Sequence, residues 1–483
     1  MSKELRRVAL VIFAMFASLF VSASTIQVLS ADQLNGDSRN VRSIYDSYKT
    51  KRGAILVDGQ PIASSVATAD GYHYERKYSS EMYSAVTGFY SLFQGATGLE
   101  SAMDSYLTGK NSSQFFEQIN AILSGNPVAG GSVELTIDPT VQAAAWKAMG
   151  NLKGAVVAIE PSTGRILAFV SKPGFDANLL AVHTGSQSNS NYAKLLADAG
   201  KPLINRTISG DLYAPGSVFK IIVASAAIES GMFTPKSLIP NPTRYKLPGT
   251  STYIYNSGEG KCGGKSKVTI ADALRLSCNI PFAQIGVALG QDCIRAQAEL
   301  FGFGKKISMP MTATASSYPA NMDSAQTALS AFGQYEDRVT PLQMAMVSAA
   351  IANGGVEMQP QIVENVESSS LSVLFQPQPS VFSQPVKPAT AELVKQMMIG
   401  AVSSGVSSNG QIKGVVVAGK TGTAQNGGNR PYTLWFTGFA PANNPKVAVA
   451  VVIEDGGGMG QSGFGNLLAA PVARKVMQAV LRK

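Results

Sequence analysis

Three short strings in this chain carry the residue types that an acyl-transfer reaction needs. YAPGSVFK ends at Lys220, SCN covers residues 277–279, and KTGT covers residues 420–423. Their hydroxyl, amine and amide groups can attack a carbonyl, move a proton or hold a substrate. Because they are far apart in the sequence, the fold must bring them together. The catalytic candidates are Ser217, Lys220, Ser277, Asn279 and Lys420.

The first string predicts a helix start. Pro215 and Gly216 form a turn, and the apolar stretch after them contains no glycine. We therefore expect Ser217 at the N-terminal end of a helix, with Lys220 one turn away on the same face. A lysine acts as a general base only when it is neutral, which requires burial or a second cation such as Lys420. Alone, the SxxK pattern also fits a serine N-cap beside an exposed lysine.

The chain contains few histidines and cysteines that could act as a base or as metal ligands. It contains only two histidines, His73 and His183, and a Ser-His-Asp site would need one of them beside the nucleophile. A lysine base is the simpler interpretation. The histidines and the three cysteines do not have CxxC or HExxH spacing, so we expect no zinc site.

The SCN string lies within ADALRLSCNIPFAQIG, where the apolar pattern indicates a helix that is interrupted before Pro281. Residues two apart in a helix point to different faces. Ser277 and Asn279 can therefore share one site only if the backbone leaves the helix between them. The alternative is an ordinary helix end.

The KTGT string has a strong competing interpretation. Residues 414–421 read GVVVAGKT, which matches the nucleotide-binding phosphate loop letter for letter. Such a loop starts a helix at its Lys-Thr pair, whereas the β-branched residues before Lys420 favour a strand, and glycines and Pro431 follow. We therefore expect Lys420 on a strand. GMGQSG at 458–463 lacks the later strand that a dinucleotide fold requires, and we interpret it as a loop.

Length and composition indicate a folded protein with several domains. The chain has 483 residues, of which 45% are hydrophobic and 15% are charged, and this length predicts two to four domains. The net charge of +9 is not gathered into Lys/Arg runs. It suits an anionic membrane or wall surface, and we expect no nucleic-acid partner.

The N-terminus predicts a membrane anchor. Lys3, Arg6 and Arg7 precede a stretch without charges at residues 8–29, and about 20 apolar residues span a bilayer. The positive flank keeps the N-terminus inside, so the rest of the chain should lie outside the cytoplasm. The alternative is a signal peptide cleaved near residues 21–23.

An exported location permits disulfides. Cys278 lies within SCN, and Cys262 lies in the glycine-rich loop GKCGGK, which could fold back on it. Cys262 and Cys278 are therefore the candidate pair, leaving Cys293 free. Three reduced cysteines remain the alternative, because a sequence does not give connectivity.

Residues 1–30 form the predicted cytoplasmic tip and membrane anchor, and two further regions follow them. Residues 31–130 are polar and rich in Gly and Ser, and we expect a small α+β module. It has a strand candidate at 54–57 and helix candidates at 100–107 and 113–123.

Residues 131–483 are more regular. The expected order of their elements is two strands, a helical middle, three strands and a last helix. This order predicts the α+β type of α/β protein. Its central antiparallel five-stranded sheet would be covered by helices, and the helical middle would form a subdomain. Residues 368–383, rich in Ser, Gln and Pro, are expected to form an exposed loop. The expected strands are 154–160, 165–170, 415–424, 433–440 and 447–454, the helical middle is 217–353, and the last helix is 467–483.

The set SxxK, SxN and KTG in this order, the last on a strand, resembles the motifs of penicillin-binding proteins and related β-lactamases. Nearly the whole chain resembles class B penicillin-binding proteins, particularly actinobacterial ones. The resemblance implies a penicillin-binding/transpeptidase fold over residues 131–483, preceded by a pedestal or dimerisation-like module at 31–130. Its further segments are RNVRSIYDSYKTKRGAILVDG from Arg39, GFYSLFQGATGLE from Gly88, LTIDPTVQ from Leu135, VTPLQMA from Val339 and LWFTGFAP from Leu434.

This resemblance implies a D,D-transpeptidase that cross-links peptidoglycan and is acylated by β-lactams. Ser217 would attack the carbonyl between the two terminal D-alanines of a stem peptide, and Lys220 would take its proton. Ser277 would relay a proton to the departing D-alanine, while Asn279 orients the substrate. Lys420 would supply positive charge.

The substrate-binding candidates implied by the family are Thr421, Gly422 and Thr423. The two threonines would hold the substrate carboxylate. The backbone N–H groups of Ser217 and Thr423 would form the oxyanion hole, and losing one such donor typically costs about 10²–10³ in rate.

The resemblance also implies partners and alternatives. We expect stem peptides, β-lactams, the cytoplasmic membrane and a polytopic glycosyltransferase with other wall-synthesis proteins as partners, and no cofactor. A D,D-carboxypeptidase or β-lactamase would differ in using water as the acceptor. A penicillin-binding sensor or scaffold with slow turnover is the alternative outside these enzyme classes.

Overall fold

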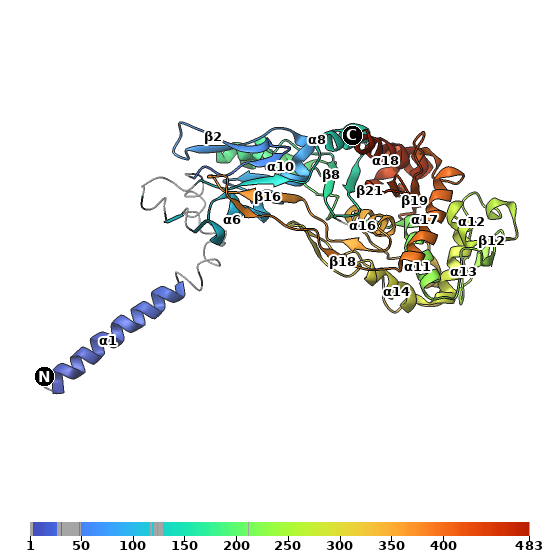
Figure 1. Cartoon of the computed structure of the whole chain (residues 1–483), viewed down its shortest axis with the longest axis horizontal. Helices are drawn as coiled ribbons and strands as arrows, with labels where there is room; N and C mark the ends of the chain where they lie inside the picture. Colours follow the sequence, from blue (N-terminus) through green and yellow to red (C-terminus); the bar gives the residue numbers. More distant parts are fainter. Residues whose placement is uncertain are drawn as a thin grey trace.

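The computed structural model describes residues 3–26, 30, 48, 50–115, 118–119, 123, 129–210 and 212–482. Its folded part is elongated, with an N-terminal sheet towards one end and a helical region at the other (Figure 1). Helix α1 (Lys3–Ser24) has no buried residue, and its most apolar window has a mean hydropathy of 2.0. Within the described ranges it is the one helix long and apolar enough to span a membrane.

A five-stranded antiparallel sheet forms the centre of the C-terminal part, in the spatial order β19-β20-β21-β7-β8. It confirms the sheet predicted from the sequence. Every residue of β7, β20 and β21 is buried, which explains their nearly continuous apolar sequences. The strands are β7 (Gly154–Ile159), β8 (Ile166–Lys172), β19 (Ala418–Ala424), β20 (Thr433–Ala440) and β21 (Val447–Ile453).

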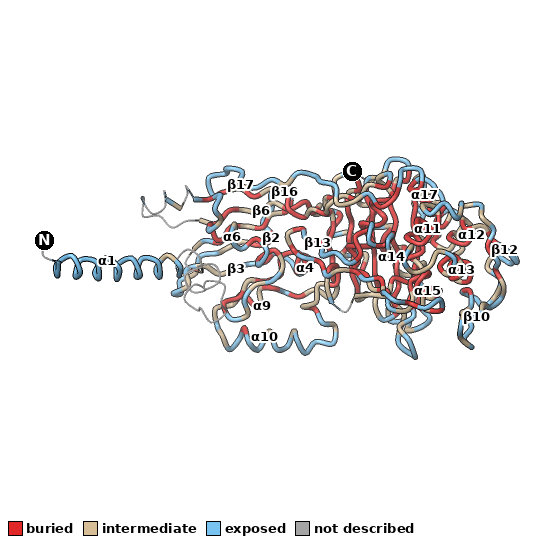
Figure 2. The backbone as a smooth tube through the Cα atoms, turned by 90° about the horizontal axis from the view of Figure 1, so that it is seen from below, coloured by how far each residue is buried: buried red, intermediate tan, exposed pale blue. Residues whose placement is uncertain are grey.

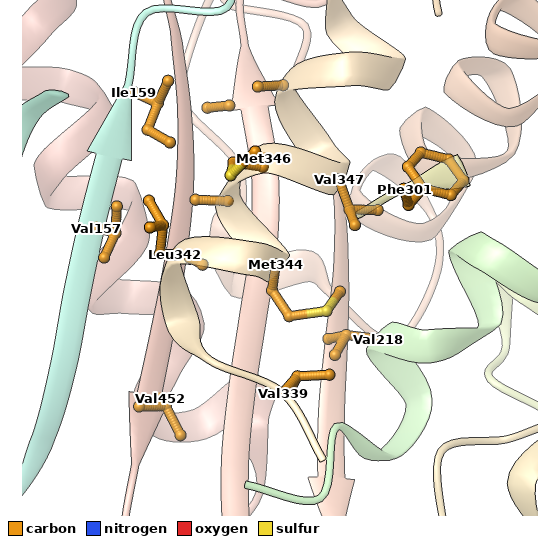
Figure 3. Close-up of a cluster of buried hydrophobic side chains, with 14 of the residues drawn as sticks. Val157, Ile159, Val218, Phe301, Val339, Leu342, Met344, Met346, Val347 and Val452 are labelled. Atoms are coloured by element: carbon orange, nitrogen blue, oxygen red, sulfur yellow. The ribbon is translucent and has the colours of Figure 1, made fainter. Parts of the chain in front are cut away.

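Helices cover both faces of this sheet. Val156 and Val451 belong to the apolar cluster formed with α8 (Pro139–Met149) and α18 (Gly465–Leu481). Their neighbours Val157 and Val452 belong to the other cluster, against α16 (Pro341–Ala352) (Figure 3). Because alternate residues of a strand point to opposite faces, each strand contributes to both cores.

The expected helical middle is confirmed, and it continues past the sheet into the far end of the molecule. Burial is dense where α11, α14 and α17 lie (Figure 2). Eight consecutive residues of α11, from Lys220 to Ala227, are buried. A helix covered on all sides is apolar all round, so a lysine at its first position must have a specific role. The helices are α11 (Lys220–Glu229), α12 (Ile270–Arg275), α13 (Asn279–Leu289), α14 (Gln291–Leu300), α15 (Ser324–Ser330) and α17 (Pro388–Ser403).

The N-terminal sheet, here called the pedestal sheet, has six strands in the order β17-β16-β6-β1-β2-β3. Its interior contains Glu100, which is fully buried and pairs with Arg52 and Arg76 at 2.6 Å each. The strands are β1 (Ile55–Val57), β2 (Gln60–Ala67), β3 (Tyr74–Tyr78), β6 (Ser132–Leu135), β16 (Val363–Glu367) and β17 (Val373–Phe375).

The pedestal sheet differs from the sequence interpretation in its membership. Half of its strands, β6, β16 and β17, come from the range 131–483 that we expected to belong to the catalytic domain. The range 368–383, expected as a loop, contains β17 and β18 (Val381–Ser383), both edge strands whose residues are exposed or half-buried. Both are three residues long, too short for a clear alternating pattern.

The remaining expectations concern short elements. The strand expected at 54–57 is β1, and the helix expected at 100–107 is divided into α5 (Gly98–Ala102) and α6 (Asp104–Leu107). The helix expected at 113–123 includes residues 116–117 and 120–122, which lie outside the described residues. The short elements are α4 (Ser84–Thr87), α9 (Asn178–Ala181), α10 (Gly185–Ala197), β4 (Tyr90–Ser91), β5 (Gly95–Ala96), β9 (Leu238–Pro240), β10 (Tyr245–Lys246), β11 (Tyr253–Ile254), β12 (Lys267–Thr269), β13 (Ile307–Ser308), β14 (Thr312–Ala313) and β15 (Glu357–Met358).

Candidate active site

Ser217 lies in a 3-10 turn, Gly216–Phe219, that leads directly into α11. The turn is fixed by close backbone contacts. Gly216 has φ +56° and its N–H donates to Gly333 O at 2.8 Å. A Cβ at Gly333 would lie 1.9 Å from Gly216 O, so no side chain fits there. The expected helix start is present, and its serine is held on a rigid turn beside α11.

Lys220 is the first residue of α11 and is completely buried. Its Nζ donates to Ser277 O and Asn279 Oδ1, both at 2.9 Å, and to Ser277 Oγ at 3.4 Å. Within the described ranges, Ser217 Oγ makes no hydrogen bond to Lys220. The hydrogen bond between a catalytic nucleophile and its base often shortens only when substrate binds. The structure thus connects the SxxK and SCN motifs through Lys220.

The SCN motif forms a tight turn between α12 and α13. Ser277 has φ +59°, a left-handed conformation that non-glycine residues rarely adopt. Asn279 is the first residue of α13. The backbone therefore leaves the helix where we expected, and both Ser277 and Asn279 reach Lys220.

Lys420 completes this cluster from β19. It is completely buried, and its Nζ donates to Ser277 Oγ and to Thr421 O, each at 2.8 Å. Ser277 Oγ therefore lies within hydrogen-bonding reach of two lysines. β19 is a strand and not the loop-helix junction of a phosphate loop, so the nucleotide interpretation is excluded by the local fold.

The residues after Lys420 have different surroundings. A Cβ at Gly422 would lie 2.9 Å from Pro215 O, so this glycine allows β19 to pack directly against the Ser217 turn. Thr421 N donates to Ser407 Oγ at 3.0 Å, and the two hydroxyl oxygens lie 3.1 Å apart. Thr423 Oγ1 accepts from Gly465 N at 3.3 Å. Both threonine hydroxyls thus have partners within the protein.

Two supporting residues were missed by sequence reasoning. Ser407 is fully buried beside Thr421, and Gly333 supports the turn of Ser217. Ser407 lies in the string SSGVSSNG, where nothing separates it from the other serines. Their positions follow from contacts between distant segments, which local patterns do not encode.

Burial controls the charges of the two lysines. Burial lowers the pKa of Lys220 well below its usual range, and the nearby Lys420 lowers it further. Burial also lowers the pKa of Lys420, to about 7. Lys220 is therefore the amine better suited to remain neutral, as a general base must, while Lys420 keeps its proton below about pH 7.

These shifts predict a bell-shaped pH dependence of acylation. The rate should rise as Lys220 loses its proton and fall above about pH 7 as Lys420 loses its own. The check is a series of acylation rate constants with a fluorescent penicillin across this range. Lys420→Arg should remove the alkaline decline, because a guanidinium stays protonated. An undiminished wild-type rate well above neutral pH would contradict the assignment.

The remaining polar candidates lie elsewhere or are structural. His183 is paired with Asp70 in the loop between β2 and β3. Cys262 and Cys278 are joined by a disulfide, and Cys293 is free. Within the described ranges, no group of three or more His, Cys, Asp or Glu side chains is arranged to hold a metal ion.

Comparison with known proteins shows similarity over the whole length of this chain. The sequence profile of the penicillin binding protein transpeptidase domain matches residues 154–478, and that of the penicillin binding protein A dimerisation domain matches residues 52–133. The chain is 39% identical to the peptidoglycan D,D-transpeptidase PbpA of Mycolicibacterium smegmatis, with 100% of each chain covered. It is 38% identical to PbpA of Mycobacterium tuberculosis, covering 100% of this chain and 99% of the relative.

Solved structures agree with the sequence comparison. The ceftriaxone acyl-enzyme complex of penicillin-binding protein A from M. tuberculosis superposes with a TM-score of 0.87 at 38% identity. The match covers 90% of this chain and 100% of that one.

Proposed function

This chain belongs to the penicillin-binding protein transpeptidase family, and on that basis we propose that it cross-links peptidoglycan through an acyl-enzyme on Ser217. It is a serine-type D,D-transpeptidase and a β-lactam target. The observation that best supports the residue assignment is the chain of contacts from Lys220 through Ser277 to Lys420. It lies beside the turn that presents Ser217.

The first half-reaction is acylation. Ser217 Oγ attacks the carbonyl carbon between the two terminal D-alanines, and its proton passes to neutral Lys220. As the C–N bond breaks, the leaving amine receives a proton through Ser277, whose hydroxyl contacts both lysines. D-alanine departs, and the remaining stem peptide is joined to Ser217 as an ester.

The second half-reaction transfers the acyl group. An amine of a neighbouring stem peptide attacks the ester carbonyl, an amide bond forms as the ester C–O bond to Ser217 breaks, and the amine's proton returns to Ser217 Oγ through Lys220. Lys220 thus carries protons in both directions, while the protonated Lys420 supplies positive charge beside it. Their common contact with Ser277 makes this hydroxyl the natural relay.

Substrate binding is assigned to the edge of β19. The N–H groups of Ser217 and Thr423 are proposed as the oxyanion hole, because both belong to segments in direct backbone contact. Thr421 and Thr423 would hold the terminal carboxylate, with Ser407 orienting the Thr421 hydroxyl. Gly422 contributes by allowing the close approach of strand and turn.

The anchor and the module boundaries complete the proposal. α1 would cross the cytoplasmic membrane once, with the catalytic part outside, because Lys3, Arg6 and Arg7 flank its start. We assign residues 31–130 to the pedestal and 131–483 to the catalytic domain, with β6, β16 and β17 joining the two parts. A polytopic glycosyltransferase is the proposed partner that supplies glycan strands.

A donor and acceptor assay tests this function. A stem peptide ending in D-Ala-D-Ala is incubated with the protein, with and without an amine acceptor, and the released D-alanine and the cross-linked peptide are both measured. We expect cross-linked product that requires the acceptor and disappears after penicillin treatment. Hydrolysis without transfer would indicate a carboxypeptidase, and a penicillin adduct lost within seconds would indicate a β-lactamase. Stable labelling without either product would indicate a sensor.

A further inference from the structure

The start of α13 needs an acceptor that the SCN turn does not supply. Ser277, in the left-handed conformation, closes the end of α12: its N–H donates to Leu274 O at 3.2 Å, and Cys278 N donates to Ala273 O at 2.8 Å. The N-cap position of α13 is Cys278, whose side chain makes no capping hydrogen bond. Its sulfur is bonded to Cys262, so it is committed elsewhere. The first N–H groups of α13 must find an acceptor from another segment.

That acceptor is Asn256, which follows β11 in the sequence and is 3% exposed. Its Oδ1 accepts from Asn279 N and from Ile280 N, both at 3.0 Å. The geometry is that of a side-chain N-cap, but the cap is provided from more than twenty residues away. Asn256 therefore determines where α13, and with it Asn279, begins.

Asn256 is itself held by a second buried amide. Its Nδ2 donates to Asn241 Oδ1 at 2.9 Å and to Gly260 O at 3.1 Å. Asn241 is fully buried, and its Nδ2 donates to Cys262 O and Lys265 O, each at 2.8 Å.

Asn241 Oδ1 accepts a second hydrogen bond, from Cys262 N at 3.3 Å. Both amides thus use all the hydrogen bonds that an asparagine side chain offers. A network that is fully satisfied in this way fixes one orientation of its members.

The network reaches the catalytic cluster through Asn279. Asn279 Nδ2 donates to Tyr255 O at 3.2 Å, so residues 255–256 hold both the side chain and the backbone of Asn279. Asn279 Oδ1 accepts from Lys220 Nζ at 2.9 Å. We propose that Asn256, oriented by Asn241, is a positioning residue that sets the SCN turn against Lys220. This inference rests on the proposed function, because it assigns a kinetic role through Lys220 and Ser277.

The test compares acylation kinetics of the full chain with a fluorescent penicillin. Asn256→Ala removes the cap acceptor, so Asn279 and Ser277 should shift relative to Lys220, and a displacement of about 1 Å can cost about 10²-fold in rate. We expect the acylation rate constant to fall by about 10- to 100-fold. A merely structural role would lower the amount labelled at saturation, through loss of folded protein, and would leave the rate constant unchanged.

A matched control is Asn178→Ala. The Asn178 amide also joins two segments, accepting from Tyr78 N at 2.9 Å and donating to Tyr78 O at 3.0 Å, but it lies at the pedestal sheet. We expect its acylation rate constant to equal that of the wild type.

Asn256→Asp provides a second variant if the alanine variant folds poorly. Its carboxylate retains the acceptor for Asn279 N and Ile280 N and suits a helix N-terminus, but it loses the two Nδ2 donations to Asn241 Oδ1 and Gly260 O. Its rate constant should therefore lie between those of Asn256→Ala and the wild type.

The outcomes separate this inference from the proposed function. If the wild type is labelled at Ser217 while Asn256→Ala keeps the wild-type rate constant, the positioning role is overturned and the proposed function stands. If Asn256→Asp is as slow as Asn256→Ala, the cap acceptor is not the determinant, and the inference fails. If the wild type is not labelled, the proposed function fails and this inference fails with it.

Discussion

Ser217→Ala is expected to abolish covalent labelling by a fluorescent penicillin while leaving the fold intact. The substitution removes the only hydroxyl on the turn between Gly216 and Phe219, and an amine base without a nucleophile cannot form the acyl-enzyme. Ser217 is not fully buried. The free energy of unfolding of the Ser217→Ala protein should therefore differ from that of the wild type by no more than about 0.5 kcal/mol. Gel fluorescence and a thermal unfolding curve check both parts.

Ser209→Ala is the matched control. Ser209 lies in the segment that precedes α11 in the sequence. Its hydroxyl donates to Asn205 O at 2.8 Å, which is a local structural contact. We expect wild-type labelling from this variant. Equal labelling of wild type and Ser217→Ala would place the nucleophile elsewhere.

Lys220→Met is expected to lower the acylation rate constant by about 10²–10⁴-fold, the usual contribution of a general base. Methionine is similar in length and cannot take the proton from Ser217. Lys220→Arg should be equally impaired, because a guanidinium stays protonated. Initial noncovalent binding of the penicillin should persist, since the residues proposed to hold its carboxylate lie on β19. Stopped-flow measurement separates the two quantities.

The Lys220→Met variant should also be less stable than the wild type. Losing the amine leaves Ser277 O and Asn279 Oδ1 without a donor, at a cost of about 1–3 kcal/mol. The control variant Lys172→Met should be acylated at the wild-type rate. Lys172 lies at the end of the outer strand β8, where its Nζ donates to Gly150 O and lies over the ring of Trp146 in α8. A Lys220→Met enzyme with the wild-type rate constant would show that another group is the base.

Features encoded locally could be predicted from the sequence. The valines before Lys420 favoured an extended backbone, and Lys420 does lie on the strand β19, although this strand begins at Ala418 and not at Val415 as expected. Two motif residues only two positions apart required a break in the helix, and Ser277 adopts φ +59° at that break. The turn of Pro215 and Gly216 likewise located the start of α11.

Features that depend on distant contacts could not be predicted. Asn241 and Asn256 are ordinary asparagines in the sequence, and their role arises from hydrogen bonds to α13 and to the disulfide loop. β16 and β17 joined the pedestal sheet although more than two hundred residues separate them from β6. Strand pairing at that distance has no local signal, so the sequence interpretation placed these residues with the catalytic domain.

The most direct test of the central claim is mapping the penicillin adduct by mass spectrometry. The wild-type protein is acylated, denatured and digested with trypsin, which should release the peptide from Thr207 to Lys220. We predict that this peptide carries the adduct, and that fragmentation places it on Ser217 and not on Ser209. An adduct on any other residue, or a fully folded protein that acquires none, would contradict the account.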